Sequence, residues 1–163
     1  MNRADILARF RRRGWTVEER PRSRLRLPDP IAARYPNLPV ALVEFLGGLS
    51  SCDNASQTAW FLCEADYWGT SGAAFRWDEW ERMSLAAWDG DRHGIAKVQA
   101  FWDSHFPFML SVQFGYAYYA VCTTADEFGR VVTGREPEFE YVSPVAESFE
   151  LFLSFLLSKV DHA

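Results

Sequence analysis

The stretch FMLSVQFGYAYYAVCTTADEFGRVVT, residues 108–133, decides the fold. It contains three apolar, aromatic or β-branched runs, and Gly115 and Gly129 mark turns between them. Such runs, joined by short glycine-containing turns, are typical of neighbouring antiparallel strands. The sequence therefore predicts an antiparallel meander with strands over 108–112, 116–122 and 130–133.

A helix is expected to follow this meander. Another strand is predicted over 139–142, after which Ser143 suits a helix cap and Pro144 the first helical position. The apolar residues beyond them repeat at helical spacing, which is the strongest periodic signal in the chain. They are Val145, Phe149, Phe152, Leu153, Leu156 and Val160.

Weaker patterns precede the meander. Helices are predicted over 2–14, over 39–47 and in the later part of 75–83, and residues 95–101 fit either a strand or a short helix. A short strand is expected to begin at Trp15, an extended connector over 20–30 and a strand over 58–63. The fold class is therefore α+β, one domain with a mixed, mostly antiparallel sheet packed by helices. Residues 1–30 are its basic N-terminal helix and connector, and residues 31–160 its main body.

The charges are divided unevenly along the chain. The net charge is −5, yet residues 1–34 hold ten Arg and four acids, whereas the other 129 residues hold 7 basic and 18 acidic groups. A basic segment beside an acidic body can dock on that body or on an acidic partner. Because the acidic body would repel phosphate, we expect no direct binding of nucleic acid.

Composition also bounds the class of protein. A chain of 163 residues suits one domain, and 48% hydrophobic content excludes global disorder. The cysteines Cys52, Cys63 and Cys122 are odd in number and lack CxxC spacing, which favours reduced thiols in a cytoplasmic protein. The sequence shows neither an apolar signal segment nor a run of 18 apolar residues, so no membrane association is predicted.

Motifs for catalysis or metal binding fail on their spacing. The chain has no HExxH and no Gly-x-Ser-x-Gly, and the calcium-loop pattern starting at Asp89 has Ala100 where a bidentate Glu is needed. Cys122 and His105 could form a nucleophile and base only if the fold brought them together. The sequence therefore predicts no catalytic residue, no metal and no cofactor, and the chain is not expected to be an enzyme.

One constellation remains, in which acids alternate with aromatic residues between positions 64 and 91. Acids steer a basic partner and aromatic side chains anchor it, although the tryptophans could equally face inward with the acids outward. Tyr67 and Trp68, beside the loop Gly69–Gly72, fit a core least well. The predicted partner-binding residues are Glu64, Asp66, Tyr67, Trp68, Asp78, Glu79, Glu81, Asp89 and Asp91.

The order of landmarks resembles the SUKH superfamily, the Smi/Knr-like proteins. The resemblance covers about residues 31–157 and is closest in the last helix, Val145–Leu153, which is similar to the family's Ala-x-Ser-Phe-x-x-Phe-Leu. The chain departs from the family at Phe114-Gly115, where an Asp-Gly turn is common, and at Cys122-Thr123, where an acid often follows the aromatic strand. Earlier landmarks are Tyr35-Pro36-Asn37-Leu38-Pro39, Leu42, Phe45-Leu46, Trp60-Phe61-Leu62, Phe106-Pro107-Phe108, Gly115, Tyr118, Tyr119, Gly129 and Val131-Val132.

The resemblance implies an immunity protein, because many bacterial members bind and neutralise a cognate toxin, often a nuclease. We therefore expect a protein partner, a basic toxin domain, and a monomer or weak homodimer in its absence. One alternative is a regulatory interaction scaffold without a toxin partner, as in fungal relatives. The third is a small-molecule-binding domain or an enzyme with an aromatic pocket.

Overall fold

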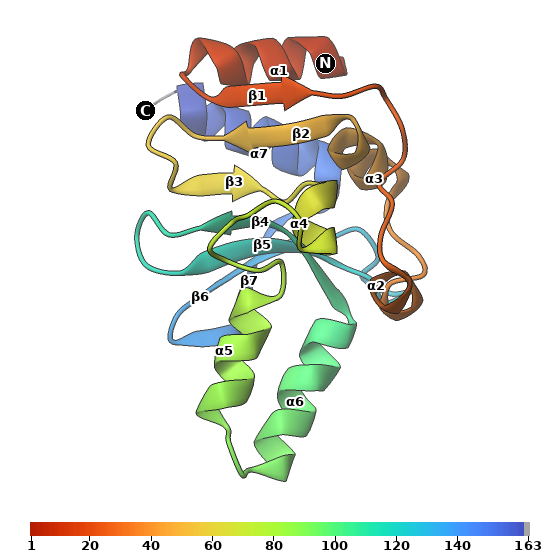
Figure 1. The fold of residues 1–163 in the computed structure, drawn as a ribbon, viewed down its shortest axis with the longest axis vertical. Helices are drawn as coiled ribbons and strands as arrows, with labels where there is room; N and C mark the ends of the chain where they lie inside the picture. Colours follow the sequence, from red (N-terminus) through yellow and green to blue (C-terminus); the bar gives the residue numbers. More distant parts are fainter. Residues whose placement is uncertain (162–163) are drawn as a thin grey trace.

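An antiparallel sheet, with its strands in chain order, forms the centre of the fold. The computed structural model describes residues 1–161, which form one α+β domain (Figure 1). The described strands follow the order β1-β2-β3-β4-β5-β6-β7, and each pairs antiparallel with the next. They are β1 (Thr16–Glu19), β2 (Leu49–Asp53), β3 (Ala59–Phe61), β4 (His105–Ser111), β5 (Ala117–Cys122), β6 (Val131–Arg135) and β7 (Glu138–Ala146).

Helices cover both faces of this sheet. Figure 1 shows α7 behind the sheet and α4 in front, while α5 and α6 project beyond it as a helical hairpin. The helices are α1 (Arg3–Arg12), α2 (Asp29–Arg34), α3 (Val40–Gly47), α4 (Glu64–Trp68), α5 (Glu79–Ala87), α6 (Arg92–Asp103) and α7 (Phe149–Asp161).

Adjacent aromatic residues of a strand pack on opposite faces of the sheet. Tyr119 lies 4.8 Å from Phe152 of α7, measured between ring centroids, whereas Tyr118 lies 4.8 Å from Trp102 of α6. Successive strand residues point to opposite faces, so the run Tyr118-Tyr119 fills both layers. Phe61, on the α7 side, packs against Phe108, and its neighbour Trp60 faces the α4 side.

The connector after β1 is held along α3. Leu25 donates its backbone N–H to Val43 O at 2.9 Å. A Cβ added to Gly47 would lie 1.9 Å from Ser23 O, so only glycine allows the two backbones to approach this closely. The connector was predicted as extended over 20–30; it contains neither helix nor strand until α2 begins at Asp29.

The predicted meander is confirmed, but the start of the last helix was wrong. Ser143 and Pro144 belong to β7, where they pair with Thr133 and Val132 of β6. The helix begins at Phe149, and Ser148 Oγ accepts the Leu151 N–H at 3.2 Å. Pro144 is tolerated because β7 is an edge strand, where a residue whose N–H side faces solvent need not donate a hydrogen bond to a neighbouring strand. Residues 95–101, left open between strand and helix, lie within α6.

Candidate functional site

Three of the predicted partner-binding residues are buried, which corrects the expectation that they are surface groups. Tyr67 is 3% exposed, its ring stacks on Phe106 with centroids 5.1 Å apart, and its hydroxyl donates to Pro107 O at 2.8 Å. This residue was expected to fit a core poorly, and it is part of the core. Tyr67 can be buried because its hydroxyl has a hydrogen-bond acceptor on the backbone.

Glu64 is the second of the buried residues, and arginines of the N-terminal segment surround it. Its carboxylate accepts from Arg20 Nη1 at 2.9 Å and from the Arg26 backbone N–H at 2.8 Å. Burial opposes its ionisation, but these hydrogen bonds and charges outweigh burial and leave the pKa of Glu64 below its ordinary value. The basic segment therefore docks on the acidic body at this point.

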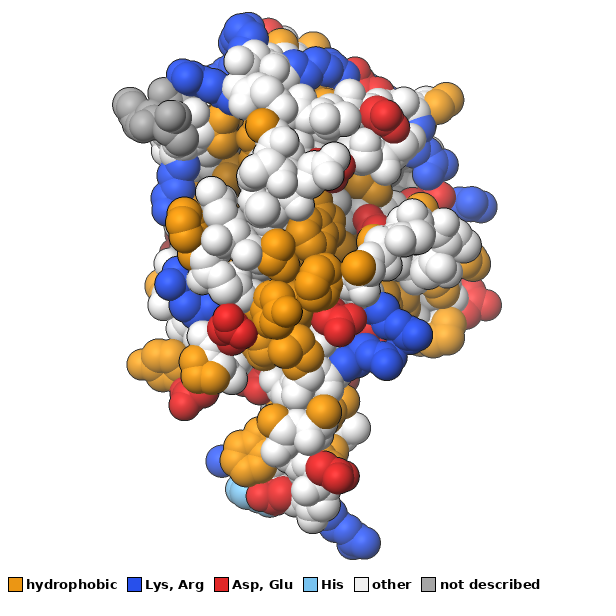
Figure 2. All heavy atoms as spheres, turned by 60° about the vertical axis from the view of Figure 1, so that its left-hand side comes forward, with side chains coloured by type: hydrophobic (Ala, Val, Ile, Leu, Met, Phe, Trp, Pro, Cys, Tyr) orange, Lys and Arg blue, Asp and Glu red, His pale blue; other side chains and the backbone are white. Residues whose placement is uncertain are grey.

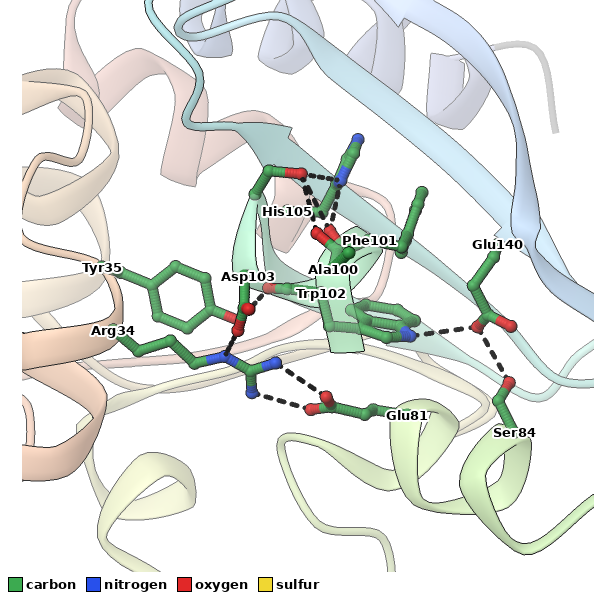
Figure 3. A network of polar contacts seen from close by, with 11 residues as sticks. Arg34, Tyr35, Glu81, Ser84, Ala100, Phe101, Trp102, Asp103, His105 and Glu140 are labelled. Atoms are coloured by element: carbon green, nitrogen blue, oxygen red, sulfur yellow. Dashed lines mark hydrogen bonds and ion pairs between the residues drawn. The ribbon is translucent and has the colours of Figure 1, made fainter. Parts of the chain in front are cut away.

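Glu81 is the third buried residue, and it belongs to the polar network of Figure 3. Arg34 donates to both Glu81 oxygens, at 2.8 and 2.7 Å, and its Nε donates to Asp103 at 2.9 Å. On the other side of the hairpin, Glu140 accepts from Ser84 at 2.8 Å and from the Trp102 indole at 3.0 Å. These contacts attach α5 and α6 to α2 and to β7, so their role is structural.

The remaining six predicted residues lie in three separate places. Asp66 and Trp68 are on α4, Asp78 and Glu79 lie at the start of α5, and Asp89 and Asp91 are at the tip of the hairpin. Trp68 is 50% exposed, while Asp91 caps α6 by accepting from the His93 and Gly94 N–H groups at 3.1 Å. The fold therefore does not join the predicted residues into one continuous surface.

A different set of aromatic residues forms a connected surface. Figure 2 shows hydrophobic side chains gathered down the middle of one face, with acidic side chains beside them. On the α4 and α5 side of the sheet, Phe75 lies between Trp60 and Tyr116, with ring centroids 6.0 and 5.6 Å apart. All three rings are only partly buried. We call Trp60, Phe75 and Tyr116 the aromatic stripe.

A groove of about 520 Å³ opens beside the aromatic stripe. Asp53 of β2, Trp60 of β3, Asp66 of α4 and Phe75 line it, together with small residues of the loop 71–74. Asp53 and Trp60 are direct partners in the β2–β3 ladder, so their side chains lie on the same face of the sheet. We call this the acidic groove.

The two carboxylates of the acidic groove differ in their surroundings. Asp66 accepts the Cys63 N–H at 2.8 Å and so caps α4. Burial raises the pKa of Asp53, and the charges of Asp66 and Glu18 raise it further. Of the groove-lining residues, only Asp66 was among the predicted partner-binding residues. Asp53 was missed because β2 carries no clear strand pattern and was not predicted.

The surroundings of His105 and Cys122 do not suit a nucleophile and its base. His105 and Cys122 are register partners between β4 and β5. However, His105 Nδ1 lies 2.7 Å from Phe101 O, and the imidazole stacks on the Phe101 ring. Burial raises the pKa of the Cys122 thiol to about 11. This environment disfavours the thiolate that nucleophilic chemistry requires.

The described residues contain no group of three His, Cys, Asp or Glu side chains placed to hold a metal ion. In residues 1–161 no helix has the length and apolar character needed to cross a membrane. None of the family models, curated proteins or solved structures compared with the chain matches it.

Proposed function

We propose that this chain is a protein-binding domain, and that it acts as an immunity protein that neutralises a basic bacterial toxin. The observation that carries the proposal is the partly exposed aromatic stripe of Trp60, Phe75 and Tyr116 beside the carboxylates of the acidic groove. Aromatic side chains dominate binding hot spots because they bury a large area with few rotatable bonds. The resemblance to the SUKH superfamily supports the narrower role of toxin neutralisation.

Charge supports a basic partner. Beyond residue 34 the chain holds 18 acidic and 7 basic groups, and several of the basic residues near its start are already used inside the molecule. A field of this sign raises the association rate of a positively charged partner, especially at low ionic strength. Nuclease toxins bind phosphate backbones and tend to be basic, which matches this complementarity.

The test begins with co-expression. The chain is produced with the product of a neighbouring toxin gene, and complex formation is measured by co-purification and calorimetry alongside survival of the host cells. We expect a stoichiometric complex and protection. A complex without protection would instead favour a regulatory scaffold, and the absence of both would refute the proposal.

Matched variants locate the interface. Phe75→Ala removes the central ring of the aromatic stripe and should weaken the complex by about thirtyfold, the effect of a typical hot spot. Leu151→Ala is the control, because Leu151 is 57% exposed on α7, on the opposite side of the sheet. Both variants should keep the far-ultraviolet circular dichroism spectrum of the wild type. Equal affinity for both variants would move the interface away from the stripe.

A further inference from the structure

The acidic groove combines two carboxylates that come from different elements. Asp53 ends β2, and Asp66 lies in α4, thirteen residues beyond Asp53 in the sequence. Asp66 uses one carboxylate oxygen, Oδ2, to cap α4. Within residues 1–161 the Asp53 carboxylate has neither a hydrogen bond nor an ion pair. A partly buried carboxylate without a partner favours any cation that reaches it.

The walls of the groove are aromatic, and one of them carries an unsatisfied donor. Trp60 and Phe75 both line the groove, with their ring centroids 6.0 Å apart. The Trp60 indole N–H is buried and has no acceptor among the described residues. A buried donor without an acceptor costs on the order of 1–3 kcal/mol. The unpaired N–H thus belongs to a residue that lines the groove, but the nitrogen itself is buried, and the polar group open to a ligand is the carboxylate of Asp53.

No Lys or Arg is among the described residues that line this groove. The contrast is the groove of about 540 Å³ between α1, α3 and α7, which Arg3, Arg22 and Arg24 line. Glu18 adds to the negative field at Asp53. Arg20 of the N-terminal segment is paired with Glu64. Among residues 1–161, therefore, no cation neutralises the charge of the acidic groove.

We propose that the acidic groove receives an arginine side chain of the protein partner, an inference that rests on the proposed function. A guanidinium group is planar, so it can stack on an aromatic ring while its N–H groups bond to carboxylates on its edge. The groove offers both surfaces, a pair of rings and a pair of carboxylates. A lysine ammonium is a compact, strongly hydrated charge and gains less from the rings.

The test uses N-acetyl-arginine amide as the probe, with the citrulline and lysine amides as controls. Citrulline has the shape of arginine without its charge. The indole signals of the seven tryptophans are followed by nuclear magnetic resonance, and Trp60→Phe assigns the Trp60 signal. We expect the arginine amide to shift this signal in a saturable way, and at lower concentration than the lysine amide does. An equal response to citrulline, or no shift at about 100 mM arginine amide, would overturn the inference.

Variants then connect the groove to the partner. Asp53→Asn should weaken arginine-amide binding at least tenfold, whereas Asp126→Asn, an exposed acid in the turn between β5 and β6, should leave it unchanged. If the partner complex forms but Asp53→Asn does not weaken it, this inference fails while the proposed function stands. If the amide binds the groove but no partner complex forms, the proposed function fails and the arginine site remains.

Discussion

Arg34 holds Glu81 with two parallel hydrogen bonds, from Nη1 to Oε1 at 2.8 Å and from Nη2 to Oε2 at 2.7 Å. The side chain of Glu81 is 8% exposed and that of Arg34 is 23% exposed. Because water is largely excluded, these hydrogen bonds raise the pKa of Arg34 further above its ordinary value, and burial only partly opposes them. The contact joins α2 to the base of the helical hairpin.

Arg34→Lys should therefore destabilise the fold although it conserves the charge. Lysine cannot bond both Glu81 oxygens and Asp103 with one planar group, and it leaves Glu81 with fewer donors. We expect a loss of about 2 kcal/mol in the free energy of unfolding, measured by urea denaturation. Arg22→Lys, at an exposed position of the connector, is the control and should lie within about 0.5 kcal/mol of the wild type. Equal stability of both variants would show that the contacts of Arg34 with Glu81 and Asp103 do not stabilise the fold.

The sequence predicted the elements in which a long repeat could be recognised. The meander around Tyr118 and Tyr119 has alternating, β-branched and aromatic character, and α7 repeats its apolar residues over several turns. The short elements α2 and α4 were missed, since helices of five or six residues complete too few turns to show a period. Ser143 and Pro144 suit a helix start locally, but pairing with β6 overrode that local preference.

The predicted partner-binding residues could be chosen from composition, but their positions in the fold could not be predicted. An alternation of acids and aromatic residues says nothing about which of two neighbours faces inward, and α4 buries Tyr67 while exposing Trp68. Glu64 and Glu81 look like surface acids in the sequence, yet each contacts an arginine from the first 34 residues, 44 and 47 positions away. The pairing of Asp53 with Trp60 depends on the β2–β3 register, which the sequence alone did not reveal.

Substitutions of Gly47 and Gly69 should destabilise the fold for different reasons, a steric clash at Gly47 and an unfavourable backbone conformation at Gly69. Gly47→Ala should cost about 3 kcal/mol or more, because its Cβ would lie 1.9 Å from Ser23 O and 2.7 Å from Leu25 N, which are backbone atoms that cannot rotate away. Gly69→Ala should cost only about 1 kcal/mol, since its Cβ meets nothing within 4 Å and only its positive φ of 71° is unfavourable. Thermal denaturation of both variants checks the order, and the reverse order would contradict the close packing of the connector on α3.

Glu64 should make the fold sensitive to acid. Its pKa in the folded state lies below the ordinary value of 4.5, so its stabilising effect is complete above that value and is lost as the pH falls through the folded pKa. Glu64→Gln should lose about 1–2 kcal/mol at pH 7, because the hydrogen bonds to a charged acceptor are weakened. The difference from the wild type should shrink below pH 4.5 in urea titrations. A constant difference down to pH 3 would assign the effect to packing instead of charge.

The three thiols should react slowly in the native protein. Cys52, Cys63 and Cys122 are free and buried, and burial raises the pKa of Cys52 to about 12 and that of Cys122 to about 11. The thiolate is the reactive form, so its fraction at pH 8 is very small. A disulfide reagent such as DTNB should label fewer than one thiol per native chain within minutes and all three in urea. Rapid labelling of a native thiol would reveal local opening of the sheet core.

The charge of Asp53 should affect both the stability of the fold and the binding of arginine. Burial raises its pKa above the ordinary value of 3.8, so the folded state binds this proton more tightly than the unfolded chain does. Ionised Asp53 therefore destabilises the fold at pH 7, and this effect vanishes below pH 3.8. Asp53→Asn should raise the Tm at pH 7, on the order of 1–2 °C, and the gain should fade as the pH is lowered towards 3.8.

A stabilising substitution that also weakens arginine binding would mark Asp53 as a group whose charge serves recognition and not folding. Thermal denaturation between pH 4 and pH 8 gives the stability, and the Trp60 indole signal gives the binding in the same samples. Asp126→Asn supplies the matched comparison, because it removes one negative charge from an exposed turn. A lower Tm for Asp53→Asn at pH 7 would mean that the carboxylate has a stabilising partner in the folded chain and is not free to receive a cation.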